Sequence, residues 1–308
     1  MDWELNLMKS IPQIRLNNGN EIPVLGLGTF KIQECARPME AIFEDAFSVG
    51  IRLIDTAQGY HNEKIIGDTL CNLGVARSSY QLMTKLDDDV HFRKGAIEAI
   101  ERSLEDLRTD YIDFFLIHSP NSEVIQKCGE KLDMSVGDSW QKLNAEAWEV
   151  FEEYHEKGFI KNIGVSNFYP HHLGQLLQTA NIIPVVNQIK TTVGSILAEK
   201  KVVNYCRNKS IHVCGYSPLG KGNLINNSEL YELAKKYDRS VAKVLLRFLF
   251  ESGFTSIVKS TSKQHLEEIV SIFDFSIQED DKSFLEKYMI EENWAKVRNP
   301  DTGEKYNH

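Results

Sequence analysis

The sequence predicts a closed (β/α)8 barrel, or TIM barrel, of the α/β class. Short runs rich in β-branched and aromatic residues recur eight times along the 308 residues and alternate with segments of helical spacing. This alternation is typical of parallel strands joined by crossover helices. Eight such units in roughly 250 residues are what a barrel needs, whereas a doubly wound sheet usually has fewer strands and a glycine-rich first turn. We expect a single domain over residues 1–308.

An N-terminal β-hairpin is expected over residues 11–25, before the barrel begins. Two short apolar runs flank Asn18-Gly19-Asn20, and Asn and Gly tolerate the positive φ of a tight turn. We expect this hairpin to cover one end of the barrel. The barrel strands are predicted, in chain order, at residues 25–28, 52–56, 80–86, 111–118, 160–165, 185–189, 212–216 and 255–258.

Three segments depart from the strand-helix repeat. Residues 121–144 form a long polar connection after the fourth strand, and residues 291–308 form a polar tail that carries Trp294. Loops that follow barrel strands emerge on the C-terminal face, so we expect both to lie over that face as long loops, the first as a substrate loop. Residues 228–252 contain two helical patterns, one more than the repeat needs.

The composition is that of an ordinary soluble protein, with 42% hydrophobic and 26% charged residues. Apolar runs are too short for a membrane span and the N-terminus lacks a signal-peptide pattern, so we expect a cytoplasmic protein with no membrane partner. The net charge of -9 argues against a nucleic-acid partner, although a local basic pocket remains open. Five cysteines without a CxxC pair predict reduced, mostly buried thiols.

An aspartate and a tyrosine stand at the end of the second predicted strand. Asp55 closes an apolar run, and Tyr60 follows in the loop beyond Gly59. A carboxylate removed from water needs a partner cation, and a tyrosine beside such a pair could act as a proton donor. A structural aspartate that bonds turn amides, with a packing tyrosine, is the alternative.

Two further polar residues end the third and fourth predicted strands. Lys85 and His118 would share the C-terminal face of a barrel with Asp55 and Tyr60. Lys85 would balance Asp55, and its ammonium would favour the phenolate of Tyr60 and so make the phenol a better acid. His118 could donate a hydrogen bond to a substrate oxygen, or it could be a satisfied core histidine.

Two glycine-rich segments resemble nucleotide-binding motifs but lack residues that those motifs need. The run from Gly26 to Lys31 begins like a dinucleotide fingerprint, but Lys31 replaces its third glycine. Residues 215–222 nearly match a P-loop, yet Gly222 stands where Ser or Thr must bind magnesium, and Pro218 removes an amide. This segment could still hold a pyrophosphate in another way. No metal site is expected, because the following residues lack ligand spacing and are interpreted as solvated helix positions: Glu152, Glu153, His155, Glu156, His171 and His172.

The chain resembles the aldo-keto reductases, NAD(P)H-dependent carbonyl reductases built on this barrel. The matching pieces, in the family's order over residues 14–290, are LGLGTFK, IDTAQGYHNE, TKL, SLEDLRTDYIDFFLIHSP, GFIKNIGVSNF, VVNQIK, GYSPLG and VKS. The resemblance implies reduction of a small-molecule aldehyde or ketone. It also implies a catalytic tetrad of Asp55, Tyr60, Lys85 and His118, with Tyr60 as the proton donor.

The same resemblance implies NADPH as the cofactor, with NADH as a second possibility. An amide-binding group, a tyrosine under the nicotinamide ring, a loop over the pyrophosphate and an adenosine phosphate site are expected. The residues implied are Thr29, Asp55, Ser166, Asn167, Gln188, Tyr216, Ser217, Leu219, Lys221, Lys259, Ser260, Thr261, His265 and Glu268.

Departures from the family pattern affect cofactor and substrate. His265 stands where the family usually has an arginine for the 2′-phosphate, and Ile269 replaces an asparagine. A histidine carries less charge near neutral pH and offers no bidentate fork, which weakens the NADPH preference unless Lys263 compensates. Ser119 replaces a tryptophan of the substrate pocket. The residues expected to face the substrate are Tyr60, His118, Phe30, Trp140 and Trp294, with both tryptophans alternatively serving as loop anchors.

A protein of another class could share these features. Relatives of this family serve as nicotinamide-binding sensor subunits or structural proteins without physiological turnover. The intact tetrad favours the enzyme. A metal-dependent barrel hydrolase lacks the ligand clusters. Monomer and weak dimer are both open, as are the physiological substrate and the stereochemistry of its product.

Overall fold

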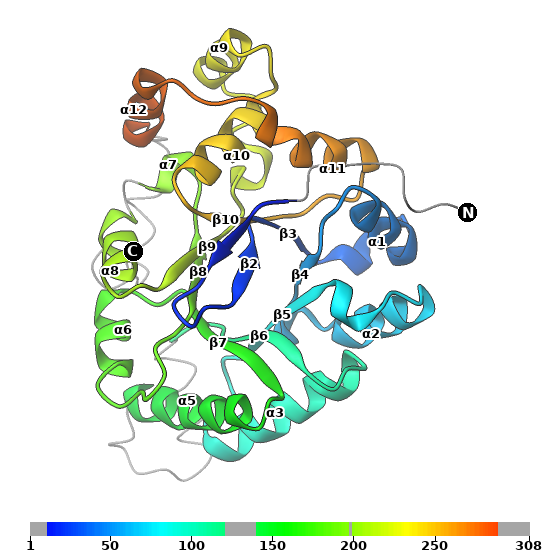
Figure 1. Ribbon diagram of the computed structural model, residues 1–308, viewed down its shortest axis with the longest axis vertical. Coiled ribbons are helices and arrows are strands. Elements are labelled where there is room, and N and C mark those ends of the chain that lie inside the picture. Colours follow the sequence, from blue (N-terminus) through cyan, green and yellow to red (C-terminus); the bar gives the residue numbers. More distant parts are fainter. Residues whose placement is uncertain (1–10, 121–139, 197–198, 289–308) are drawn as a thin grey trace, which may run out of the picture.

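Eight parallel strands close into a barrel with helices around it, which confirms the predicted fold class (Figure 1). The computed structural model describes residues 11–120, 140–196 and 199–288. Each strand lies within one residue of its predicted bounds. In chain order the strands are β3 (Leu25–Gly28), β4 (Leu53–Asp55), β5 (Gln81–Leu86), β6 (Ile112–Ile117), β7 (Ile160–Ser166), β8 (Val186–Lys190), β9 (His212–Tyr216) and β10 (Thr255–Val258).

The helices bury an apolar stripe against the outside of the barrel. In α3 the buried residues include Ala96, Ala99, Ile100 and Ser103, which recur at intervals of three to four as a one-sided helix requires. The described helices are α1 (Met39–Ser48), α2 (Glu63–Asn72), α3 (Arg93–Asp106), α5 (Trp140–Glu156), α6 (Pro170–Leu176), α7 (Val193–Ile196), α8 (Lys200–Asn208), α9 (Ser228–Lys236), α10 (Val241–Glu251), α11 (Lys263–Val270) and α12 (Glu279–Lys287).

The N-terminal hairpin closes one end of the barrel, as predicted. Strands β1 (Gln13–Arg15) and β2 (Glu21–Pro23) pair antiparallel, and in Figure 1 they cross the barrel opening. The side chains of Asn18 and Asn20 both donate to Oδ1 of Asn162, near the start of β7. The hairpin therefore covers the N-terminal ends of the strands and leaves the opposite face for a site.

Side chains fill the barrel interior. Leu53, Met83 and Phe114 are fully buried there together with Ile22 of the hairpin. A Cβ at Gly26 would lie 2.8 Å from Ile257 Cδ1 and 2.9 Å from the Leu53 side chain. The glycines that imitate a dinucleotide fingerprint thus belong to a barrel strand, where they allow tight packing.

The extra helix expected over residues 228–252 is present, because α9 and α10 both lie between β9 and β10. The predicted C-terminal bound of the 121–144 loop is wrong. Residues 140–144 form the first turns of α5, because Leu143 and Asn144 belong to the buried stripe of that helix. Residues 121–139, the 291–308 tail, Trp294 and Cys128 lie outside the described residues.

The prediction that Glu152 is a solvated helix position is wrong. Its carboxylate is buried and accepts hydrogen bonds from the backbone N–H of Asn181 and Ile182, at 2.7 and 2.8 Å. It anchors the loop that precedes β8. His172 is partly buried as well, and its Nδ1 accepts from the backbone N–H of Tyr169 at the start of α6.

The described cysteines are less uniformly buried than expected. Cys206 and Cys214 are buried, Cys35 is partly exposed and Cys71 is exposed.

None of the helices that the structure describes combines the length and apolar character needed to cross a lipid bilayer. The same residues contain no group of three or more His, Cys, Asp or Glu side chains placed to hold a metal ion.

Candidate active site

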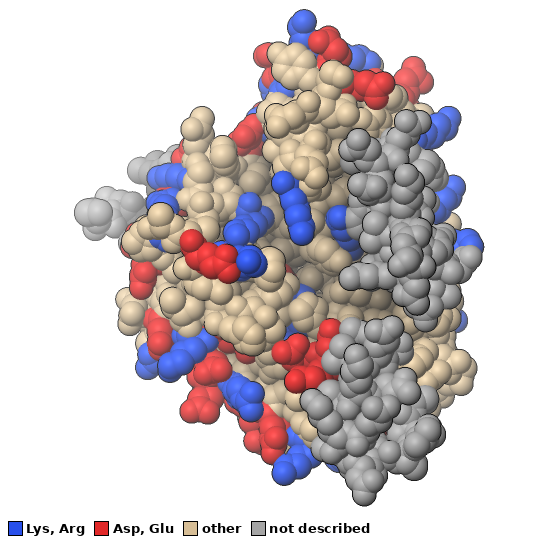
Figure 2. Space-filling view, turned by 180° about the vertical axis from the view of Figure 1, so that it is seen from behind, with Lys and Arg blue, Asp and Glu red and all other residues tan. Residues whose placement is uncertain are grey.

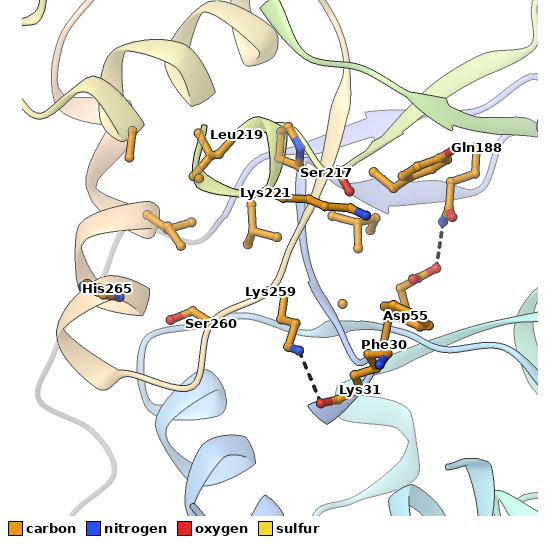
Figure 3. Close-up of a pocket in the computed structure, with 18 of the residues that line it drawn as sticks. Phe30, Lys31, Asp55, Gln188, Ser217, Leu219, Lys221, Lys259, Ser260 and His265 are labelled. Atoms are coloured by element: carbon orange, nitrogen blue, oxygen red, sulfur yellow. Dashed lines mark hydrogen bonds between the residues drawn. The ribbon is translucent and has the colours of Figure 1, made fainter. Parts of the chain in front are cut away.

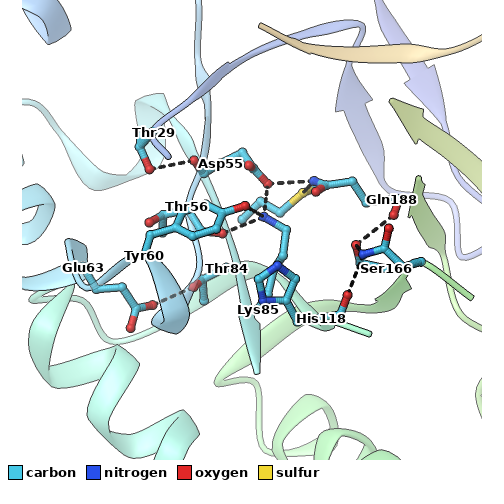
Figure 4. Close-up of polar contacts among 12 residues, drawn as sticks. Thr29, Asp55, Thr56, Tyr60, Glu63, Thr84, Lys85, His118, Ser166 and Gln188 are labelled. Atoms are coloured by element: carbon cyan, nitrogen blue, oxygen red, sulfur yellow. Dashed lines mark hydrogen bonds and ion pairs between the residues drawn. The ribbon is translucent and has the colours of Figure 1, made fainter. Parts of the chain in front are cut away.

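Three neighbouring strand ends bring four polar side chains together on the C-terminal face (Figure 4). Asp55 ends β4, Lys85 lies one residue before the end of β5, and His118 follows β6. These strands pair in the order β4, β5, β6, so their ends are adjacent. Tyr60 comes from the 3-10 turn η2 (Gln58–Tyr60), which follows β4.

Lys85 and Asp55 form a buried ion pair. Lys85 Nζ lies 2.7 Å from Asp55 Oδ1 and also donates to the carbonyl of Thr56 at 2.8 Å and to the hydroxyl of Tyr60 at 3.4 Å. Burial lowers the pKa of Lys85, but Asp55 and Tyr60 raise it by more, so the pKa lies above its ordinary value. Lys85 is therefore an ammonium beside the tyrosine, as predicted.

Lys85 acts on Tyr60 in the predicted direction, but burial outweighs it. Burial raises the pKa of the phenol and Asp55 adds to this, whereas Lys85 lowers it by less. The net pKa is higher than that of an ordinary tyrosine, because the low-dielectric surroundings penalise a phenolate more than one ammonium stabilises it. The phenol therefore keeps its proton at neutral pH.

His118 is held as a neutral imidazole. Burial lowers its pKa to about 3, and the positive charge of Lys85 acts in the same direction. Its ring centroid lies 5.8 Å from that of Tyr60, edge to face. A neutral imidazole carries one N–H, so His118 can donate one hydrogen bond while it adds no charge.

A cavity of about 990 Å³ begins at this cluster and extends across the C-terminal face. Figure 2 shows basic side chains around the hollow, and Figure 3 shows Lys221 crossing it and Lys259 reaching the carbonyl of Lys31. These three lysines line a cavity in a chain of net charge -9. A basic groove of this kind attracts an elongated anion, such as one that carries phosphates.

Most of the predicted site residues line this cavity. Those that do are Phe30, Asp55, Tyr60, His118, Ser166, Asn167, Gln188, Tyr216, Ser217, Leu219, Lys221, Lys259, Ser260, His265 and Glu268. Lys85 lies fully buried behind Asp55 and Tyr60.

A few predicted residues do not line the described cavity. Thr29 is fully buried, and its hydroxyl donates to the carbonyl of Asp55 at 2.9 Å. Thr261 offers its carbonyl to Arg37, and Lys263 is likewise absent from the lining. Trp140 instead packs edge to face against His171 and His172 of α6.

Comparison with known proteins decides the family. A sequence model of the Aldo/keto reductase family matches residues 24–289. The chain belongs to the aldo/keto reductase family.

Named aldo-keto reductases cover most of the chain. A glyoxal reductase of Bacillus subtilis is 34% identical over 268 residues, 87% of this chain and 89% of that protein. Aldose reductase C of Dictyostelium discoideum is 35% identical over 279 residues, 87% of this chain and 86% of that protein. An aldo-keto reductase of Bombyx mori, solved in complex with NADP, is 30% identical with a TM-score of 0.76, covering 90% of this chain and 92% of that one. The protein is thus an NAD(P)-dependent oxidoreductase.

The cavity of this aldo-keto reductase fits a nicotinamide cofactor. Asn167, at a φ of 60°, donates from Nδ2 to the carbonyl of His118 and to Ser166, and accepts from the hydroxyl of Tyr216 at 2.9 Å. Gln188 donates to Asp55 at 2.7 Å. Fixed amides beside the strand-end cluster suit a carboxamide, and the lysines farther along suit a pyrophosphate.

Some lining residues of the aldo-keto reductase site were not predicted. Lys31 was noted only as the break in a glycine motif, and Ser240 was not singled out within residues 228–252. Only Ser240 carries a signal that the sequence could have shown, since serine is favoured at helix N-caps. Lys31 has a positive φ of 57° before a 3-10 turn, and Ser240 is the N-cap of α10.

Proposed function

We propose that this enzyme reduces an aldehyde or ketone to the alcohol with NADPH, and that Tyr60 is the proton donor. The observation that carries the proposal is the arrangement at the end of the cavity. A protonated phenol lies 3.4 Å from a buried ammonium and beside a neutral imidazole, with Tyr60 and His118 both exposed to the cavity.

The cofactor would lie along the groove, held by the chain at both ends. Ser166, Asn167 and Gln188 would orient the carboxamide, and Lys221 and Lys259 would bind the phosphates. When bound, the nicotinamide supplies the hydride that a carbonyl carbon accepts.

The protein supplies the proton and the orientation of the carbonyl. The phenol of Tyr60 would protonate the carbonyl oxygen, and Lys85 would stabilise the phenolate that remains. Asp55 keeps Lys85 charged in the barrel interior. The single N–H of neutral His118 would hold the carbonyl oxygen against Tyr60.

Preference for NADPH over NADH would arise at the far end of the cavity. Lys259, Ser260 and His265 line that end. Lys259 can pair with a 2′-phosphate, which NADH lacks. His265 offers a phosphate no bidentate fork of the kind that an arginine provides, so it would add less to this preference than an arginine would.

The test is the rate of loss of reduced nicotinamide absorbance with a panel of carbonyl compounds, in Tyr60→Phe against wild type. The panel includes glyoxal, since one relative is a glyoxal reductase. Removal of the donor should lower kcat by about 10²-fold or more, with NADPH binding by fluorescence unchanged. The matched control is Tyr231→Phe, a tyrosine that is 60% exposed on α9.

Other results would redirect the proposal. Turnover retained in Tyr60→Phe would place the proton elsewhere. A wild-type protein that binds NADPH but reduces no carbonyl would favour the sensor or structural alternative. The cytoplasmic location, the single domain over residues 1–308 and a monomeric or weakly dimeric state stay predictions.

A further inference from the structure

A glutamate that the proposed reaction does not use lies buried behind the catalytic cluster. Glu63 is the first residue of α2 and is 5% exposed. Its Oε1 accepts a hydrogen bond from the hydroxyl of Thr84 at 2.6 Å, and its Oε2 accepts one from the hydroxyl of Ser103 at 3.1 Å. One carboxylate therefore joins α2, β5 and α3.

The first of these bonds acts on the strand that carries Lys85. Thr84 and Lys85 are consecutive in β5, so their side chains point to opposite faces of the barrel wall. Figure 4 shows this arrangement, with Thr84 directed to Glu63 and Lys85 directed to Asp55. Glu63 thus holds the strand from outside at the point where Lys85 enters the interior.

The second bond acts on the turn that carries Tyr60. Ser103 accepts from Nε2 of Gln58 at 2.9 Å, and the same nitrogen donates to the carbonyl of Ala99 at 2.7 Å. Gln58 begins the 3-10 turn that ends at Tyr60, and its Oε1 accepts from the backbone N–H of Asp87. The chain of bonds from Glu63 through Ser103 and Gln58 therefore fixes the base of this turn.

A buried carboxylate is a costly acceptor for two hydroxyl groups. Hydroxyl groups can find neutral acceptors, whereas burial of Glu63 raises its pKa to about 7 against the weaker effects of Thr84 and Ser103. Asp106 on α3 also raises this pKa and Lys85 on β5 lowers it slightly. A buried group that costs stability is more often retained for function than for folding.

We propose that Glu63 is a positioning residue for proton transfer, which holds Lys85 and the Tyr60 turn in register through Thr84 and through Ser103 and Gln58. The inference rests on the proposed function. The ionised carboxylate accepts both hydroxyl hydrogen bonds at once. A protonated Glu63 keeps one accepting oxygen and donates from the other, so one of the two hydroxyl bonds must reverse and its hydroxyl must reorient.

Ionisation of Glu63 should therefore appear in the pH profile. With its pKa at about 7, the ionised form and both connections predominate above neutrality. We expect kcat for carbonyl reduction to rise as pH increases through about 7. His118 does not explain such a rise, because its pKa is about 3.

The test compares Glu63→Gln with wild type for kcat, KM and NADPH affinity between pH 5.5 and 9. The amide accepts only one of the two hydroxyls, so we expect about tenfold lower kcat above pH 7, unchanged NADPH affinity and loss of the rise near pH 7. Glu152→Gln is the matched control, since Glu152 is also a buried acceptor of several hydrogen bonds but lies remote on α5. It should keep the rise.

Two further measurements separate positioning from general stability. Between about pH 4.5 and 7 native Glu63 retains a proton that the unfolded chain releases, so the contribution of Glu63 to wild-type stability falls as pH rises in this range. The unfolding midpoint of Glu63→Gln should therefore increase relative to that of wild type between pH 5 and pH 8. Ser103→Ala, which cuts the Gln58 branch alone, should lower kcat by a smaller factor and weaken the rise, because protonated Glu63 can still accept the one remaining bond, from Thr84.

Each adverse result has a distinct meaning. Wild-type kcat and pH profile in Glu63→Gln, or equal losses in Glu63→Gln and Glu152→Gln, would overturn the positioning role. If Glu63→Gln does not fold, a wild-type rate in Ser103→Ala overturns it. Failure of the proposed function would appear as absence of turnover in the wild-type protein. That result would overturn both the proposed function and the positioning role of Glu63.

Discussion

At the scale of single residues, burial determines the charge of each ionisable side chain in the strand-end cluster. The same desolvation raises the pKa of Tyr60 and lowers that of His118. Both therefore stay neutral, while Lys85 stays charged because Asp55 lies 2.7 Å away. The result is one phenol proton, one neutral N–H donor and one fixed positive charge, a combination that suits the proposed proton transfer to a carbonyl oxygen.

The proposed preference for NADPH would also rest on a single residue, Lys259. Lys259→Ala should weaken NADPH binding by roughly tenfold or more, because a charge-assisted bond to phosphate contributes about 1.5–3 kcal/mol. NADH binding should change little, since NADH lacks the 2′-phosphate. Fluorescence titration with both cofactors measures this. Lys209→Ala, an exposed lysine after α8, is the control. Equal losses for both cofactors would mean that the phosphate lies elsewhere in the groove.

At the scale of elements, the close approach of two helices supports the catalytic face. Gly67 of α2 packs against the end of α3, where a Cβ would lie 2.2 Å from the carbonyl oxygen of Asp106 and 2.8 Å from Cα of Leu107. The obstructing atoms belong to the backbone and cannot rotate away. The separation of α2 and α3, which carry Glu63 and Ser103, therefore depends on a glycine.

Two glycine substitutions should consequently have opposite effects. Gly67→Ala should lower the free energy of unfolding by about 1–3 kcal/mol, because an overpacked contact must separate. Gly174→Ala in α6 should raise it by roughly 0.5–1 kcal/mol, since its Cβ would meet only the Tyr205 hydroxyl at 3.5 Å. Urea denaturation measures both. Similar values for the two variants would contradict the packing argument.

The helices and strands show which structural features the sequence pattern predicts and which it does not. All eight strands were predictable because a strand buried on both faces is an apolar run of characteristic length. The start of α5 was not, since polar residues such as Gln141 and Lys142 conceal the first turns of a helix that buries Leu143. Glu152 was misread for a related reason, because its partners Asn181 and Ile182 are distant in sequence.

At the scale of the whole molecule, buried neutral histidines should make the fold sensitive to acid. The pKa values of His91 and His212 are lowered to about 4 by burial, and those of His118 and His172 to about 3. Below about pH 6.5 the unfolded chain binds protons that the native histidines do not, so stability falls with falling pH. A shift from 6.5 to 4 corresponds to roughly 3 kcal/mol for each such histidine.

Thermal unfolding across pH tests this expectation. The midpoint should fall steeply from pH 7 to pH 4.5. His212 begins β9, and its Nε2 is hydrogen-bonded to Thr255 Oγ1. His212→Gln should make the fall in the midpoint less steep. Substitution of the exposed His61 should not. An unchanged slope in His212→Gln would show that His212 takes up protons in the folded state.

The sequence by itself determined the barrel, the hairpin, and the identity of the strand-end residues, because these follow from local periodicity and from residue types that a pattern can display. Only the tertiary structure decided their electrostatic state. The raised pKa of Tyr60, the basic groove in an acidic chain and the link from Glu63 to Lys85 arise from residues that are distant in sequence. Burial and proximity in space produce these properties, and neither quantity is written in the local pattern of residues.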